Sequence, residues 1–268
     1  MMRAKLLLLI SILLLLLTGC SRQSQTQDHW SEIKQSKRVA VGLDDSFVPM
    51  GFTKKDGQLT GYDVDLAKAV FALYDIKVDF QTIDWSMNVT ELRNGTIDLI
   101  WNGFSITPER EKKVAFSQPY LKNRQILVVL KNSGIKDFSQ LKNRALGIQT
   151  GSTAQQWYES GQKVLHAKQE ILYDQLPNSF LDLKAGRIQG ILLDEIYADY
   201  YLAHLPKNDY QVIVDKKTPA DYFAVGIRKT DPTLRKKINQ GLKKLQANGE
   251  LRRLNQKWFG TDSNYLGE

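Results

Sequence analysis

Charged side chains beside predicted helix starts are the residues of this chain that could do chemistry, and Arg110 is the clearest of them. Thr107 and Pro108 come just before it and have the pattern of a helix N-cap followed by a first turn. Arg110 would therefore place a cation where the helix dipole favours anions. A carboxylate paired with the guanidinium in bidentate fashion would compensate for this. The sequence leaves open whether that carboxylate belongs to a ligand or to the protein itself.

A second anion-holding element is predicted at residues 149–154, which read Gln-Thr-Gly-Ser-Thr-Ala. Ser152 and Thr153 fall at the start of an expected helix, where hydroxyls and free backbone N–H groups form a ready site for an anion. The Gly-Lys-Ser/Thr ending of a nucleotide-binding P-loop is missing from this stretch. We therefore expect this turn to hold a carboxylate and not a nucleotide phosphate.

Acidic and aromatic side chains follow other predicted strands. Asp194 comes directly after one strand, Asp44 and Phe47 come after another, and Trp85 opens the helix after a third. Each has an ordinary alternative, because the acids could cap a turn or helix and the rings could belong to the core. An ammonium site of Asp194 and Ser105, added to the anion-holding elements above, would complement a zwitterion.

The elements that must position these residues alternate between strands and helices along the chain. Apolar runs of four to six residues indicate buried strands, and apolar residues at helical spacing indicate the helices between them. This alternation predicts mostly parallel sheets covered by helices, with ligands bound at the carboxyl ends of the strands. The expected strands are 38–43, 77–82, 98–101, 125–130, 145–149, 188–193 and 224–228, and the expected helices are 61–74, 87–93, 152–160, 180–185, 195–205, 232–248 and 251–258.

The N-terminus has the pattern of a bacterial lipoprotein signal peptide over residues 1–19. Arg3 and Lys5 precede an apolar run over residues 6–17, which is too short to span a bilayer as a helix. The run ends in Leu-Thr-Gly before Cys20, which resembles the lipobox whose cysteine is acylated. An ordinary cleaved signal peptide with an incidental cysteine is the alternative. Because Cys20 is the only cysteine, no intrachain disulfide can form.

Residues 20–37 are expected to form a lipidated polar tether, since the stretch after Cys20 has little apolar content to pack. Cleavage before Cys20 would remove two basic residues and lower the formal net charge from +8 to +6. The lysines are scattered, and no basic stripe with interleaved aromatic residues is present, so we reject a nucleic-acid-binding function. A cationic surface near an anionic membrane or cell wall explains the charge better.

The order and spacing of several segments resemble the family 3 bacterial solute-binding proteins, the polar amino acid receptors of ABC importers. The resemblance runs from about Arg38 to Gly260. It is carried by Val-Gly-Leu-Asp at 41–44 with Phe-Val-Pro at 47–49, Gly-Tyr-Asp-Val-Asp-Leu at 61–66, Gly-Thr-Ile-Asp-Leu at 95–99, Thr-Pro-Glu-Arg at 107–110, Val-Ala-Phe-Ser-Gln-Pro-Tyr at 114–120, Gly-Ser-Thr-Ala at 151–154 and Trp-Phe-Gly at 258–260.

This resemblance implies an α/β fold of the type II periplasmic-binding-protein kind, a two-lobed Venus flytrap with mixed sheets flanked by helices. Two hinge strands would join the lobes at residues 120–124 and 219–222. Lobe 1 would be discontinuous and comprise residues 38–120 and 223–268, and lobe 2 would comprise residues 124–218. The length of about 240 residues after the tether suits two lobes of ordinary domain size.

The resemblance also implies roles for individual residues: aromatic walls, an ammonium site, a carboxylate site and a residue that reads the distal end of the ligand side chain. The aromatic walls would be Phe47 and Trp85, and the ammonium site would be Gly103, Ser105 and Asp194. The carboxylate site would be Arg110 with Thr153, and Asp44 would read the distal end of the ligand side chain. Gln149 departs from some glutamine-binding relatives, which carry Lys at this position. The resemblance therefore implies an amino acid ligand without fixing which one.

The implied function is capture of a polar L-amino acid in the cleft between the lobes and its delivery to the permease and ATPase subunits of an ABC importer. We expect a monomer on the outer face of the cell membrane, without cofactor or enzymatic activity. One cysteine and three scattered histidines give no metal-ligand spacing. A cyclohexadienyl (arogenate or prephenate) dehydratase on the same fold is the enzyme alternative, with Glu195 or Asp45 as a general acid. A sensor module that works through a separate membrane partner is another.

Overall fold

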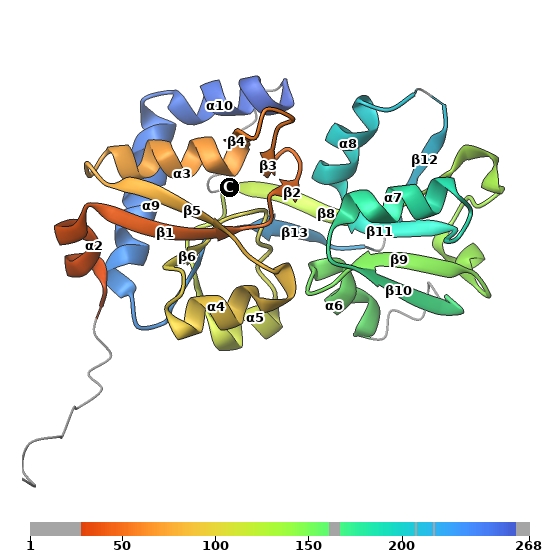
Figure 1. Cartoon of the computed structure of the whole chain (residues 1–268), viewed down its shortest axis with the longest axis horizontal. Helices are drawn as coiled ribbons and strands as arrows, with labels where there is room; N and C mark the ends of the chain where they lie inside the picture. The colour runs from red at the N-terminus through yellow and green to blue at the C-terminus, as the bar shows by residue number, and fades with distance from the viewer. Residues whose placement is uncertain (1–27, 161–166, 207, 217, 261–268) are drawn as a thin grey trace, which may run out of the picture.

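The computed structural model describes residues 28–160, 167–206, 208–216 and 218–260, and in this part the chain forms two lobes, each built on its own mixed sheet (Figure 1). The first sheet has the strand order β5-β1-β6-β14-β7. Its central strand β1 pairs in parallel with β5 and β6, and β14 is antiparallel to both β6 and β7. The bounds are β1 Arg38–Leu43, β5 Lys77–Thr82, β6 Leu99–Ile100, β7 Ala115–Phe116 and β14 Gly226–Ile227.

Helices from both ends of the chain belong to this first lobe, because α9 and α10 return to it after the second lobe is complete (Figure 1). Buried leucines and isoleucine at helical spacing along α9 explain its packing against α3. The helices are α2 Trp30–Ser36, α3 Tyr62–Ala72, α4 Asn88–Asn94, α5 Pro108–Lys113, α9 Pro232–Ala247 and α10 Glu250–Phe259.

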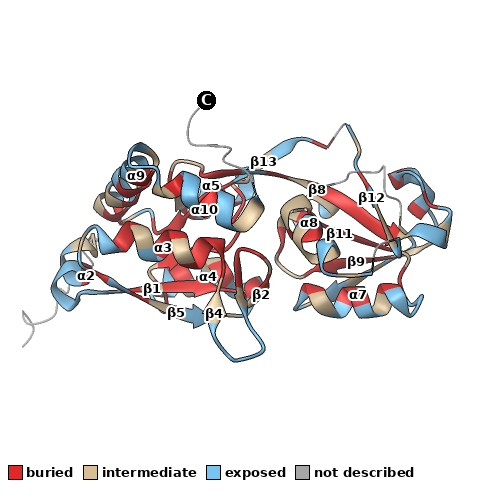
Figure 2. Cartoon of the chain, turned by 90° about the horizontal axis from the view of Figure 1, so that it is seen from above, coloured by how far each residue is buried: buried red, intermediate tan, exposed pale blue. Residues whose placement is uncertain are grey.

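The second lobe is built on a sheet with the strand order β10-β9-β11-β8-β12. The strands β10, β9 and β11 are parallel, and β8 is antiparallel to both β11 and β12. Figure 2 shows β8, β9 and β11 as largely buried, which fits their runs of Val, Leu and Ile. The elements are β8 Leu121–Leu130, β9 Ala145–Gln149, β10 Gln169–Tyr173, β11 Gly190–Asp194, β12 Tyr210–Ile213, α6 Thr153–Glu159, α7 Leu176–Lys184 and α8 Glu195–Ala203.

Two paired strands connect the lobes. The first residues of β8 leave lobe 1, and β13 (Ala220–Phe223) returns to it, antiparallel to β8. The register pairs Ala220 with Arg124 and Phe223 with Leu121. The rest of β8 continues into the sheet of the second lobe, so a single strand belongs to both the hinge and lobe 2. The two-lobed fold with two hinge strands is therefore as expected.

Most predicted elements are present, but several short ones were not foreseen. A three-stranded sheet of β2 (Ser46–Phe47), β3 (Gly51–Thr53) and β4 (Leu59–Thr60) follows β1. The strands β7, β10 and β12 and three short 3₁₀ turns of the described residues were also missed, and α7 begins four residues before the predicted helix. All of these strands except β10 have two to four residues and are too short for their hydrophobic period to be read from the sequence. The five-residue strand β10 begins with Gln and Glu and shows no clear alternation of apolar and polar residues.

The chain is folded from Asp28 onward, so the expected tether is wrong for residues 28–37. Asp28 accepts hydrogen bonds from Trp30 N at the start of α2 and from Thr233 N at the start of α9, at 3.1 and 2.6 Å. Trp30 packs edge-on against Tyr74, with ring centroids 5.3 Å apart. The signal peptide and Cys20 lie outside the described residues.

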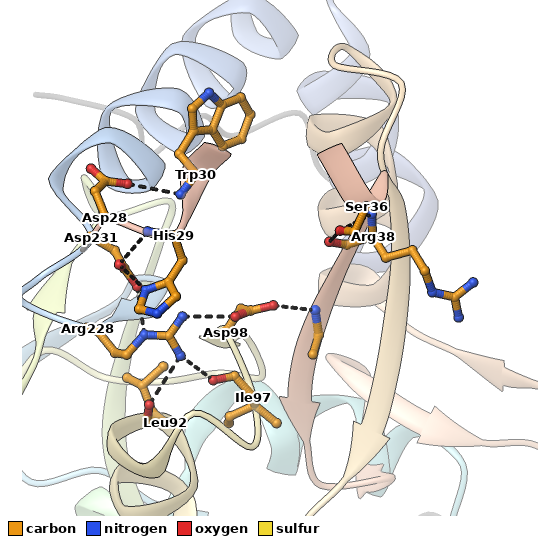
Figure 3. Close-up of polar contacts among 11 residues, drawn as sticks. Asp28, His29, Trp30, Ser36, Arg38, Leu92, Ile97, Asp98, Arg228 and Asp231 are labelled. Carbon is orange, nitrogen blue, oxygen red and sulfur yellow. Dashed lines mark hydrogen bonds and ion pairs between the residues drawn. The ribbon is translucent and has the colours of Figure 1, made fainter. Parts of the chain in front are cut away.

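A buried ionic network lies beside this N-terminal attachment (Figure 3). Asp231 is fully buried and accepts from Arg228 Nε at 2.7 Å and from the backbone N–H of His29 at 3.1 Å. His29 Nδ1 also lies 2.7 Å from Asp231 Oδ1. Arg228 continues the network to Asp98 Oδ1 at 2.9 Å and to Ile97 O at 2.7 Å. The network ties residue 29 to the first lobe through side chains that are far apart in the sequence.

No helix in the described ranges combines the length and apolar character needed to cross a membrane.

Candidate ligand-binding site between the lobes

Arg110 joins the two lobes. Thr107 caps α5 as predicted, since its Oγ1 accepts from Arg110 N at 3.2 Å. The guanidinium of Arg110 donates from Nη1 to Ser105 O in the first lobe at 3.0 Å. It also donates to the second lobe, from Nη1 to Thr153 Oγ1 and from Nη2 to Gly151 O, both at 3.1 Å. Two elements that the sequence analysis assigned to anion binding therefore meet at one guanidinium.

The guanidinium of Arg110 is buried without an ionic partner. Its side chain stacks on Phe104, 4.2 Å from the ring centroid, and the residue is 3 % exposed. No carboxylate of the described residues forms an ion pair with it. Burial lowers the pKa of Arg110 to about 10, and the charges of Asp194 and Asp221 oppose that shift. A buried charge without a paired counter-charge is costly, which favours a carboxylate from outside the chain.

The turn before α6 carries Gly151 against the first lobe. Gly151 has a φ of +71°, and a Cβ on it would lie 2.7 Å from Ser86 Cα and 3.0 Å from Trp85 O. Ser152 Oγ accepts from Gln155 N at 3.1 Å and caps α6. Thr153 therefore supplies the hydroxyl that faces Arg110, while the hydroxyl of Ser152 serves the helix.

Asp194 ends β11 and is held by two amides of β8. Asn123 Nδ2 and Gln125 Nε2 donate to Asp194 Oδ1 at 2.5 and 2.8 Å. Although α8 begins directly after Asp194, the carboxylate makes no side-chain capping hydrogen bond to that helix. Capping, the ordinary alternative for this residue, is thus not what the structure shows. Burial raises the pKa of Asp194 to about 7, and the neighbouring charge of Asp221 adds to the shift.

Asp44 and Gln149 form a second contact between the lobes. Gln149 Nε2 donates to Asp44 Oδ2 at 2.7 Å and to the backbone carbonyl of Asp174 at 3.1 Å. Asp44 also accepts from the backbone N–H and hydroxyl of Ser46. Burial raises the pKa of Asp44, while the hydrogen bonds from Ser46 and Gln149 lower it. Both predicted site residues are buried at this contact.

The two predicted aromatic walls, Phe47 and Trp85, make different ring contacts. Phe47 packs against Tyr197 of the second lobe, with ring centroids 5.3 Å apart. Trp85 packs edge-on against Phe104 at 6.0 Å and belongs to a buried cluster of the first lobe. Trp85 is only 8 % exposed, so most of its ring is committed to the core. The burial of the Trp85 ring fits the alternative that it belongs to the core, and its role as a ligand wall stays a prediction.

Gly103 is positioned by a buried acid that the sequence analysis did not single out. Gly103 N donates to Asp63 Oδ2 at 2.7 Å, and Tyr120 donates to the same oxygen at 2.9 Å. Gly103 has a φ of +57°, and a Cβ on it would lie 2.6 Å from the ring of Phe47. The backbone N–H of Gly103 is thus used within the protein. Burial raises the pKa of Asp63 to about 7.

Four other residues at the site were missed: Asn123, Gln125, Tyr197 and Asp221. Asn123 and Gln125 lie on β8, Asp221 lies on β13, and Tyr197 lies on α8. The sequence does not show which residues lie beside those on the strands, because the strand pairing decides it. No group of three or more potential metal ligands occurs among the residues that the structure describes.

Comparison with known proteins matches residues 39–261 to the model of the bacterial extracellular solute-binding proteins, family 3. The chain belongs to that family. The L-cystine-binding protein TcyJ of Escherichia coli is 30 % identical over 235 residues, 87 % of this chain and 86 % of that protein. A solved substrate-binding protein of an ABC uptake transporter from Streptococcus pneumoniae, with bound histidine, is 44 % identical with a TM-score of 0.86. The match covers 89 % of this chain and 98 % of the Streptococcus pneumoniae chain.

A third neighbour bears on the enzyme alternative. An ancestral amino-acid-binding protein described as a precursor of cyclohexadienyl dehydratase is 32 % identical, with a TM-score of 0.77, over 85 % of this family 3 chain and 98 % of its own. The two relatives described above are also named as binding proteins. The neighbour that is related to the dehydratase is therefore itself named as a binding protein, and its name does not support an enzymatic activity for this chain.

Proposed function

We propose that this family 3 protein is the extracytoplasmic substrate-binding component of an ABC importer and captures a polar L-amino acid between its lobes. The observation that carries the proposal is Arg110, a buried guanidinium that contacts both lobes and has no carboxylate partner among the described residues. An α-carboxylate would supply the direct ion-pair partner that Arg110 lacks, in the bidentate geometry that guanidinium favours. The names of the relatives, which bind cystine and histidine, support an amino acid.

The remaining site residues fit the other parts of an amino acid. Thr153 adds a hydroxyl beside the guanidinium, and the carboxylate of Asp194 would hold the α-ammonium. Phe47 and Trp85 would flank the ligand side chain, and Asp44 with Gln149 would meet its distal end. Gly103 and Ser105 would approach the ammonium side, and Ser152 would shape the turn that carries Thr153.

The charges around the cleft favour a ligand with a cationic side chain. The residues assigned to the site include three carboxylates, Asp44, Asp194 and Asp221, and a single cation, Arg110, so a zwitterion with a neutral side chain leaves this group of residues net negative. Three hydrogen bonds donated to Asp44 favour its ionised form. Arginine, lysine and protonated histidine would reduce the imbalance, and we infer that they bind more tightly than glutamine.

Capture would work by closure of the lobes. A ligand that contacts both lobes binds the closed state better than the open state and so shifts the population toward it. The contacts of Arg110 with Thr153 and of Gln149 with Asp44 already join the lobes in this structure. A ligand between them would strengthen the same closed arrangement.

We further propose that acylated Cys20 anchors the protein to the outer face of the cell membrane, where it would deliver its ligand to the permease and ATPase subunits as a monomer. The lobe limits 38–120 with 223–268, and 124–218, are kept as proposals, with hinges at 120–124 and 219–222. Pairing of β8 with β13 supports these hinge positions. Labelling with radioactive palmitate, lost in Cys20→Ala, tests the anchor.

A thermal-shift screen of the twenty amino acids and cystine tests the function, because a ligand that binds only the folded state raises its melting temperature. We expect a stabilising response from cationic amino acids, followed by calorimetry with one-to-one stoichiometry. Failure of every amino acid to bind would contradict the proposal. Turnover of arogenate or prephenate by the same preparation would instead support the enzyme alternative.

A further inference from the structure

Asp221 is a second carboxylate at the ammonium side of the site, and it lies on the hinge strand β13. Asn123 Nδ2 donates to Asp221 Oδ1 at 2.8 Å, and Gln125 Nε2 donates to Asp221 Oδ2 at 3.1 Å. The same two amide nitrogens also donate to Asp194 Oδ1. The two carboxylates are thus close enough to share both donors.

Strand pairing explains why these four side chains converge. Asn123 and Gln125 are two residues apart on β8, so they point to the same face. Across β8, the register places Asp221 directly opposite Asn123 and Asp194 directly opposite Gln125. Asp221 and Asp194 are therefore each directly opposite one of the two amide residues and diagonal to the other one. The arrangement is built into the sheet and does not depend on a loop.

The hydrogen-bond donors around Asp194 and Asp221 are too few for the acceptors that are present. Asn123 and Gln125 are 3 % and 2 % exposed, and their side-chain oxygens Oδ1 and Oε1 have no hydrogen-bond partner within the described ranges. Two carboxylates and two unpaired buried acceptors form a cluster rich in acceptors. Buried acceptors without donors are costly, so the cluster favours an added donor that carries positive charge or a proton.

Other charged groups packed against these strands are already engaged or point away. Arg110 is the cation whose charge acts on both acids. Lys122 and Arg124 alternate with the two amides along β8 and so face the other side, where Arg124 pairs with Glu195 at 2.7 Å. Burial raises the pKa of Asp194 and of Asp221, which is the direction expected for two neighbouring acids.

We propose that Asp194 and Asp221 together hold the α-ammonium of the ligand, and that in its absence they share a single proton, so that capture of an amino acid releases that proton. The proposal rests on the proposed function. Binding converts a protonated acid pair with one negative charge into two carboxylates around an ammonium, and the proton leaves to solvent. The ligand thereby links lobe 2, through Asp194, to the hinge strand, through Asp221.

Titration calorimetry at one pH in phosphate and in Tris tests this, because the two buffers differ in ionisation enthalpy and so reveal protons exchanged on binding. The probe is the tightest binder among L-arginine, L-lysine and L-glutamine, whose side chains keep their charge between pH 5.5 and 8. We expect wild-type protein to release a substantial fraction of one proton near neutral pH. We also expect the affinity to be at least about tenfold weaker at pH 5.5 than at pH 8.

Asp221→Asn keeps the size and one acceptor but removes the shared proton. It should abolish proton release, flatten the pH dependence of affinity and weaken binding at pH 8 by about tenfold. Asp209→Asn, at an exposed acid of the second lobe, is the matched control and should behave as wild type. If Asp221 only supports the hinge, the variant changes melting temperature or affinity but releases as many protons as wild type, which overturns the proposal. Wild-type binding without proton release overturns it as well, whereas absence of any amino acid binding contradicts the proposed function instead.

Discussion

Gln149 Nε2 in the second lobe lies 2.7 Å from Asp44 Oδ2 in the first, although 105 residues separate them in the sequence. Arg110 makes a second contact between the lobes, with Gly151 and Thr153. The lobes of this family 3 protein are thus joined by one contact that involves an acidic side chain and one that involves a basic side chain. That polarity matches a ligand with a carboxylate at one end and a cation at the other.

Removal of the guanidinium should abolish binding. Arg110→Ala should weaken affinity by at least about a hundredfold, since truncating one partner of a buried charge pair costs several kcal/mol. Arg110→Lys should recover little, because an ammonium lacks the fork that contacts two acceptors. Calorimetry with L-arginine measures both. Arg252→Ala, at an exposed arginine of α10, is the control, and near-wild-type affinity in Arg110→Ala would contradict the assignment.

Neutralisation of Asp44 should change which amino acids bind. Asp44→Asn should reduce affinity for L-arginine and L-lysine by about tenfold while changing affinity for L-glutamine much less, because only the cationic side chains lose a charge partner. Competition measurements on one protein preparation give the ratio directly. The exposed Asp56→Asn should leave the ratio unchanged. Equal losses for cationic and neutral ligands would show that Asp44 does not read side-chain charge.

A methyl group on Gly151 should prevent full closure. Its Cβ would lie 2.7 Å from Ser86 Cα across the cleft, so Gly151→Ala should weaken ligand affinity at least tenfold. The positive φ of Gly151 adds strain of about 1 kcal/mol that has nothing to do with closure. Gly186→Ala separates the two effects, because Gly186 has a φ of +74° and no atom within 4 Å of the added Cβ. The Gly186 variant should lose stability but keep affinity.

The buried acid Asp63 should make stability depend on pH. Its folded pKa, about 7, lies above the ordinary value of 3.8, so between these values the folded state keeps a proton that the unfolded state has lost. Stability should therefore fall as pH rises from about 4 to about 7. Asp63→Asn removes this contribution, so its free energy of unfolding relative to wild type should increase by a few kcal/mol over that window. Urea unfolding without ligand at several pH values measures the difference. A constant difference between variant and wild type would show that Asp63 titrates normally.

The N-terminal network should matter for stability and not for binding. Asp231→Asn leaves the buried Arg228 with a weaker partner and loosens His29, and we expect a loss of roughly 3 kcal/mol in unfolding free energy. Affinity for the ligand should stay within about twofold, because the network is remote from the cleft. Asp75→Asn breaks an exposed pair with Lys37 and should cost less than about 1 kcal/mol. Comparable losses in the two variants would rule out a special contribution from the buried network.

The sequence was sufficient where a residue and its partner lie close together along the chain. The cap of α5 by Thr107 follows from a local pattern, and so does the alternation of strands and helices. Ser152 was expected at the ligand, whereas its hydroxyl caps α6. The sequence also placed Arg110 and Thr153 in one site. It did not reveal Asp221, because a single acid in an extended segment carries no signal until β13 pairs with β8.

The start of the fold was misjudged for a similar reason. The polar stretch around Asp28 offers little to a hydrophobic core by itself, and its partners Thr233 and Asp231 lie about two hundred residues away. Helix α2 is only seven residues long, with Ile33 as its buried residue and Trp30 packed on Tyr74. Composition describes such a segment as a tether, whereas long-range hydrogen bonds make it part of the lobe.

If Cys20 anchors the protein as proposed, the attachment of Asp28 to the start of α9 determines which lobe is held at the membrane. Helix α2, which follows Asp28, lies at the end of the first lobe that is remote from the second lobe (Figure 1). Tension on the anchored N-terminus would be transmitted to the first lobe through α9 and the Arg228–Asp231 pair, and not through the hinge strands. The first lobe would then stay in place at the membrane, and the second lobe would move relative to it about β8 and β13.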